Sequence, residues 1–290
     1  MALEGRISIA GRAEISAIYF ALLKCGYDFY ALGREAGLAV RIGEFRGRDD
    51  FGIPFFRGVR GRTCEVYPYW PRAAALEAAT FFLDAGGTRF GDFDGYRADI
   101  MSAGNLSDEE RDEAFWDWVK DFPGALGRVL AREDFRDYWE WERGWIAGQN
   151  ARFAGALRRL SGILDACARG CASPVRTISV VLNPIKCAYS ADYHLVGETL
   201  IFTSGAFEIK SVAHEFLHHV VHPLMEARRG TVEGHGAYPG IDPSYDRAGK
   251  LNAFEEYAVR RLTDEVVAGT FPPDIEAYLD GITRDLPARP

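Results

Sequence analysis

One segment of this chain, residues 209–221, combines an uninterrupted helical pattern with a metal-binding arrangement of side chains. It contains neither proline nor glycine, and its apolar residues recur at the spacing of an amphipathic helix. Within it, His214, Glu215 and His218 form the pattern HExxH. Residues four apart share one face of a helix, so both imidazoles can bind one metal ion with Glu215 beside it. The alternative is a helix whose histidines only satisfy polar contacts in a core.

A catalytic zinc site needs a third protein ligand and keeps one position open for water. His222 lies on the same face but about 12 Å from His214 on a straight helix, and Pro223 follows it directly. We therefore assign His222 to the helix C-terminus, where it complements the helix dipole; the alternative is that it supports the metal ligands from behind. His219 lies about 100° around the helix from His218, so we expect it to face away from the metal.

A second helical segment, residues 251–262, offers two acids for the third position. Its apolar stripe runs through Leu251, Phe254, Ala258 and Leu262, and a helical wheel places Glu255 on that stripe. An acid on an apolar face needs a partner, which a metal ion provides.

The neighbouring Glu256 falls toward the polar side of the same wheel, where Arg260 and Arg261 can pair with it. We expect Glu255 on the metal and Glu256 pointing toward solvent or an arginine. Glu256 is the alternative ligand if the helix is rotated.

With these residues, segment 198–268 resembles the gluzincins, the thermolysin and aminopeptidase type of zincin, in which a Glu on a following helix completes HExxH. The matching residues are His214, Glu215, His218 and Glu255, but Phe254 stands where the family usually has Asn. The resemblance implies a zincin-like catalytic domain, one Zn²⁺ per chain and hydrolysis of peptide bonds by a metal-activated water, with Glu215 as the general base.

Such a mechanism also needs a hydrogen-bond donor for the tetrahedral oxyanion. Tyrosines and histidines in the flanking loops are candidates: His235, Tyr238 and Tyr245 downstream of the motif, and Tyr189, Tyr193 and His194 upstream. Two other functions stay open, a catalytically inactive zincin-like binding or regulatory protein and a metal-dependent amidase acting on a non-peptide substrate. The intact Glu215 argues against the first, because a structural site needs no base. Cleavage specificity and oligomeric state are not determined by these residues.

The wider pattern predicts an α+β protein with two parts, a mainly helical region 1–170 and a zincin-like domain 171–290 that contains a small mixed sheet and two metal-site helices. Apolar periodicity and capping residues predict helices at 12–24, 71–84, 107–122 and 133–164. Region 34–63 is rich in Gly and Arg, so we expect loops with a short strand there. β-Branched residues predict strands at 177–182 and 198–203, directly before the HExxH helix.

Charge and cysteine content limit the partners. The net charge is −8, and arginines are interleaved with acids, so we expect no nucleic-acid partner and a peptide or protein substrate. Neither a membrane span nor an export signal is recognisable, which predicts a cytoplasmic protein without a membrane partner. The five cysteines suit a reducing compartment. Cys167, Cys171 and Cys187 have spacings near those of a metal knuckle but lack an evident fourth ligand, so we expect buried thiols.

Overall fold

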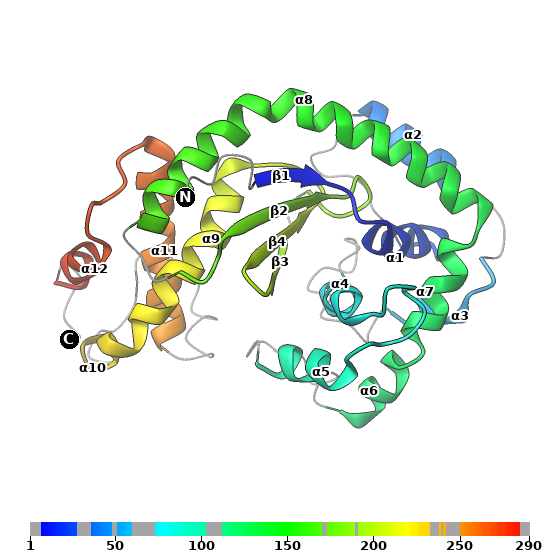
Figure 1. The fold of residues 1–290 in the computed structure, drawn as a ribbon, viewed down its shortest axis with the longest axis horizontal. Coiled ribbons are helices and arrows are strands. Elements are labelled where there is room, and N and C mark those ends of the chain that lie inside the picture. Colours follow the sequence, from blue (N-terminus) through cyan, green and yellow to red (C-terminus); the bar gives the residue numbers. More distant parts are fainter. Residues whose placement is uncertain are drawn as a thin grey trace.

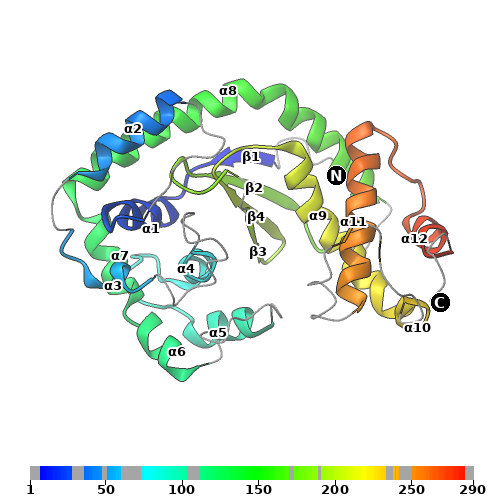
Figure 2. The same cartoon turned by 180° about the vertical axis from the view of Figure 1, so that it is seen from behind.

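The protein is α+β, with a small mixed sheet between two groups of helices (Figure 1). The computed structural model describes residues 7–27, 36–47, 51–59, 73–102, 112–169, 173–188, 191–232, 238, 240–241 and 250–284. One long helix arches over the sheet and connects the two groups, as the view from behind also shows (Figure 2).

The first group of helices precedes most of the sheet in the sequence. Its members are α1 (Ala13–Lys24), α2 (Ala36–Arg46), α3 (Pro54–Arg57), α4 (Ala74–Ala79) with the 3₁₀ turn Thr80–Phe82, α5 (Phe93–Ser102), α6 (Glu113–Val119), α7 (Phe122–Leu130) and the long α8 (Glu133–Arg169). The second group follows the sheet and consists of α9 (Ile209–Met225), the 3₁₀ turn Glu226–Arg228, α10 (Arg229–Val232), α11 (Lys250–Ala268) and α12 (Ile275–Arg284).

The helices predicted at 12–24 and 133–164 are confirmed, and the one at 71–84 is shorter, beginning at residue 74. The helix predicted at 107–122 is wrong in its bounds. Asp112 caps α6 by accepting a hydrogen bond from the Ala114 amide, and Pro123 lies in the first turn of α7 instead of ending a helix. Proline is accepted there because a first-turn amide has no partner within the helix. Ser107 lies outside the described residues.

Region 34–63 differs from the expected loops, because α2 and α3 form within it. α3 begins at Pro54, a favoured first residue of a helix, and buries Phe55 and Phe56. Aromatic burial against the neighbouring helices thus outweighs the local glycine content.

The sheet has the strand order β1-β2-β4-β3. β1 (Ile7–Ala10) and β4 (Thr199–Ser204) pair in parallel with β2 (Thr177–Leu182), while β3 (Asp192–Val196) pairs antiparallel with β4. The strands predicted at 177–182 and 198–203 are confirmed to within one residue. In the described part of the chain, β3 and β1 are therefore the two edge strands of the sheet.

The two faces of the sheet belong to two different hydrophobic clusters. On one face, Ile178, Val180 and Phe202 pack in the cluster that contains the buried side of α9 and α11. On the other face, Val181 and Ile201 pack against the cluster of the first helical group. Because successive strand residues point to opposite faces, the sheet separates these clusters. β1 and part of α8 join the first cluster, so packing crosses residue 170.

A buried ionic cluster lies on the second face. Lys186 follows β2 in the sequence. Its ammonium lies 2.7 Å from a carboxylate oxygen of Glu77 on α4 and 2.5 Å from one of Asp192 on β3. The Tyr19 and Thr203 hydroxyls donate to Glu77, and the His194 Nε2 lies 3.2 Å from it. Burial alone would lower the pKa of Lys186, but Asp192 and Glu77 raise it well above its ordinary value. The cluster fixes the start of β3 against the first helical group.

Within the described part of the chain, every helix is too short or too polar to cross a lipid bilayer.

Candidate metal centre

The HExxH motif lies in the middle of α9, as its sequence pattern predicts. Ala213, Phe216, Leu217 and Val220 are buried in the first cluster and fix the rotation of the helix. The remaining face carries His214, Glu215 and His218, all half-buried; both histidines face Glu256 of α11, and the His218 ring also faces Tyr193 of β3. Packing of the apolar side thus places the polar side at a partly enclosed surface.

Three side-chain atoms converge between α9 and α11. The Nε2 atoms of His214 and His218 lie 3.3 Å apart, and Oε2 of Glu256 lies 3.5 Å from the first and 3.4 Å from the second. These three residues form a group that can hold a metal ion. Donor atoms of a tetrahedral zinc with bonds of about 2.0–2.1 Å lie roughly 3.3–3.4 Å from one another. The donor set therefore fits zinc in both type and spacing.

Glu255, the expected ligand, has a different place. Its two carboxylate oxygens lie 2.8 Å from Nδ1 of His218 and 2.8 Å from Nδ1 of His222. A carboxylate on Nδ1 holds the ring with its proton on that nitrogen and leaves Nε2 for a metal. Glu255 thus orients His218 from behind, and it also binds His222, whose side chain is 75% exposed.

Of the two placements expected for Glu256, toward solvent or toward an arginine, the structure shows the second. Glu256 is 5% exposed and Glu255 is 9% exposed. The helical wheel could not separate the two acids because every residue from Ala253 to Val259 is buried. This part of α11 therefore has no exposed side. Arg260 does pair with Glu256 as expected, donating to its other oxygen over 2.5 Å. One carboxylate thus faces both the histidines and an arginine.

The carboxylates give the site a negative field. Burial alone would lower the pKa of His218, but Glu255 and Glu256 outweigh burial and raise that pKa to about 9. Burial opposes ionisation of Glu255 and Glu256 as well, yet the neighbouring histidines hold the pKa of both below the ordinary range. With neutral imidazoles, Glu215 and these two acids would concentrate negative charge around the Nε2 atoms. A cation is the natural counterpart.

Glu215 is the third acid of the site and differs from the other two. Burial raises its pKa above the ordinary value, and the charges of Glu256 and Asp192 act in the same direction. A carboxylate with a raised pKa is better matched to accepting and returning a proton near neutral pH.

Five of the six expected oxyanion donors either have partners elsewhere in the fold or lie outside the described residues. Tyr238 is 5% exposed and donates its hydroxyl hydrogen bond to the Val232 carbonyl, so it serves the core and does not suit that role. His235, Tyr245 and Tyr189 lie outside the described residues. His194 faces Glu77 on the other side of the sheet.

Tyr193 is the upstream candidate that contacts the motif. Its ring lies parallel to that of His218, with centres 6.4 Å apart, and edge-on to His219 at 5.7 Å. Partial burial and the nearby glutamates raise the pKa of Tyr193 to about 12, so its hydroxyl keeps a proton to donate at neutral pH. Alternation along β3 explains this placement, since Tyr193 faces α9 while Asp192 faces Lys186.

His219 and the cysteines complete the predicted set. Burial lowers the pKa of His219 to about 4, and its Nε2 is buried without a hydrogen-bond partner among the described residues. Its Nε2 is absent from the converging group of donor atoms, as expected for a ring that faces away. Cys187 is buried, and Cys171 lies outside the described residues.

Comparisons with protein-family models, with curated proteins and with solved structures find no match to this chain.

Proposed function

We propose that this protein is a zinc-dependent peptidase in which His214, His218 and Glu256 hold the metal ion. The observation that carries the proposal is the convergence of two Nε2 atoms and one carboxylate oxygen at 3.3–3.5 Å, with Glu215 on the same helix. Three protein ligands leave a fourth position for water, which distinguishes a catalytic site from a structural one.

The residues around the donor set have separate tasks. A zinc ion bound there would lower the pKa of a water molecule and polarise the carbonyl of the scissile bond. Glu215 takes the proton of the attacking water and returns it to the leaving amine. Glu255 keeps the His218 ring in place through Nδ1. We assign Tyr193 as the donor to the developing oxyanion because its protonated hydroxyl belongs to a ring that contacts the motif.

The edge of the sheet supports a peptide as the substrate. β3 pairs with β4 on one side, and its other side is an edge at which an extended peptide can add as a further strand. Three apolar side chains of this strand are exposed, Tyr193 at 45%, Leu195 at 38% and Val196 at 39%. A peptide backbone paired with β3 would pass beside Tyr193 and the HExxH helix.

The test is zinc content and hydrolysis of a mixed peptide library by wild type and Glu215→Gln. The variant is expected to keep about one zinc per chain and to lose about 10²–10⁴ of the rate, because it removes the base and no ligand. Glu208→Gln is the matched control, since Glu208 is exposed at the start of the same helix. Equal turnover by Glu215→Gln and wild type would exclude Glu215 from the chemistry, and a wild type that binds no zinc would refute the site.

A further inference from the structure

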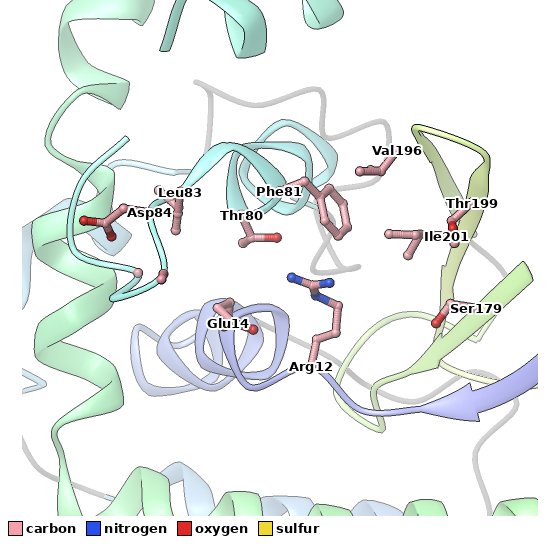
Figure 3. Close-up of a pocket in the computed structure, with 12 residues that line it drawn as sticks. Arg12, Glu14, Thr80, Phe81, Leu83, Asp84, Ser179, Val196, Thr199 and Ile201 are labelled. Carbon is pink, nitrogen blue, oxygen red and sulfur yellow. The ribbon is translucent and has the colours of Figure 1, made fainter. Parts of the chain in front are cut away.

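A pocket of about 510 Å³ lies on the face of the sheet opposite α9. Its walls are the first turn of α1, the turn after α4, and strands β2 and β4, whose Ser179 and Ile201 point into it (Figure 3). Its volume lies within the range of about 300–1,000 Å³ that is usual for small-molecule sites. The sheet separates this space from the HExxH motif, whose helix packs in the first cluster on the opposite face.

Arg12 is the cation of this pocket. Its guanidinium lies over the Phe81 ring, with its carbon 4.6 Å from the ring centre, and points into the space between Thr80 and Ile201 (Figure 3). The Nε of Arg12 is buried and has no hydrogen-bond partner among the described residues. A buried donor without an acceptor is unfavourable, and a bound anion would supply the acceptor.

The chain holds this arginine in a defined position. Arg12 follows β1 by two residues, and Gly11 lets the connection pass closely against α8, since a Cβ at this position would lie 2.6 Å from the Ile146 Cδ1. The backbone of Arg12 is extended and ends where α1 begins. Its side chain is therefore directed by packed elements on both sides and not by a loop.

The other lining residues define the class of anion. Leu83, Val196 and Ile201 provide apolar surface, which favours a ligand with an apolar body. Glu14 and Asp84 also line the pocket, and Asp84 is already paired with Arg89 at 2.7 Å. These acids disfavour a doubly charged anion such as phosphate, whereas a single carboxylate can bind the guanidinium through two hydrogen bonds.

We propose that this pocket binds a small organic monocarboxylate with an apolar body, with Arg12 as the residue that binds its carboxylate. The site lies on the other face of the sheet from the HExxH motif, so it does not depend on the proposed peptidase activity.

The experiment measures binding of N-acetyl-leucine, leucine, leucinamide and inorganic phosphate by calorimetry. The full-length chain carries His214→Ala and is kept in EDTA, so that the HExxH site cannot contribute through a metal. N-acetyl-leucine is expected to bind with a Kd of about 1 mM or tighter, as is usual for a ligand of roughly a dozen heavy atoms. Leucine tests whether the ammonium group is accepted beside the acids. Leucinamide and phosphate have no carboxylate group, so both are expected to bind at least about tenfold more weakly than N-acetyl-leucine.

In the same background, Arg12→Gln is expected to weaken N-acetyl-leucine binding at least about tenfold. Arg97→Gln is the control, because Arg97 pairs with Glu113 at the surface and does not line the pocket. Ser179→Leu is a second variant that fills the space and leaves Arg12 in place, so a folding defect of Arg12→Gln does not end the test.

Three outcomes would overturn the proposal. The first is that N-acetyl-leucine and leucine both fail to bind to the folded parent protein. The second is that N-acetyl-leucine binds to Arg12→Gln or to Ser179→Leu as tightly as to the parent, and the third is that leucinamide binds the parent as tightly as N-acetyl-leucine does. Loss of binding in Arg12→Gln and Ser179→Leu with retention in Arg97→Gln supports it.

Discussion

Glu142 on α8 is a fully buried carboxyl group whose surroundings favour the protonated form. Ser16 and Asn183 donate hydrogen bonds to its Oε1 over 2.9 and 3.1 Å, and Oε2 is buried without a partner among the described residues. Burial raises the pKa of Glu142 to about 8, against hydrogen bonds from Ser16, Tyr138 and Asn183 that lower it. A neutral acid fits this site, since an ionised one would leave a buried charge without a cation.

This pKa makes the free energy of unfolding depend on pH. The unfolded chain releases the Glu142 proton near its ordinary pKa of 4.5, whereas the folded chain keeps it up to about 8. Between these values the folded state binds more protons, so the stability that Glu142 contributes at low pH is lost as pH rises through 8. The total loss is about 4–5 kcal/mol, of which about 2 kcal/mol falls between pH 6 and pH 8.

Glu142→Gln is expected to remove this dependence, because glutamine has the shape and neutral charge of the protonated acid. Urea unfolding followed by circular dichroism at several pH values from 6 to 9 gives the free energy of unfolding of both proteins. The difference between them isolates Glu142, since all other titrating groups are shared. The variant should gain about 2 kcal/mol on wild type between pH 6 and pH 8. A difference that is constant with pH would show that Glu142 is ionised in the folded chain and refute the reasoning.

Two further predictions concern the acids of α11 and the buried lysine. Glu255→Gln is expected to weaken zinc binding by about 10–100-fold, the usual loss for a residue that orients a ligand, and Glu256→Gln is expected to weaken it more. Competition with a zinc chelator measures both affinities, and the reverse order would make Glu255 the ligand. Lys186→Met is expected to lower the free energy of unfolding by about 3–5 kcal/mol, because it leaves Glu77 and Asp192 buried without their cation; urea unfolding at pH 7 checks this, and a loss below 1 kcal/mol would contradict it.

Sequence patterns were sufficient where one physical requirement dominates. Residues 177–182 are rich in β-branched side chains and mostly buried, so they read as a strand and form β2. The stripe through residues 133–164 predicts α8, which carries three of the six tryptophans. Strand β1, with four residues, is too short for a periodic signal. Strand β3 carries Asp192 and His194, polar residues that are unusual in a strand, because they pair with Lys186 and Glu77.

The carboxylate that meets the two histidines could not be assigned from the sequence for a related reason. A wheel separates a buried from an exposed side, but α11 is covered by α9 on one side and by α10 and Tyr238 on others. Both glutamates are then buried, and each needs partners. Which one meets the Nε2 atoms depends on the rotation of α11 against α9, a property of the tertiary packing. Two adjacent acids in a buried stretch are the signal that both need polar or charged partners.

Strand β3 contacts both the buried ionic cluster and the HExxH helix, because its successive side chains point to opposite faces of the sheet. Asp192 and His194 point to the ionic cluster around Lys186 and Glu77, whereas Tyr193 between them points to the HExxH helix. A strand cannot move one of these side chains without moving the others, because their directions are fixed by the same backbone. The ionic cluster therefore sets the position of Tyr193 over His218 as well as the stability of the fold. Its buried charges hold the edge of the sheet at the place where the proposed substrate strand would pair.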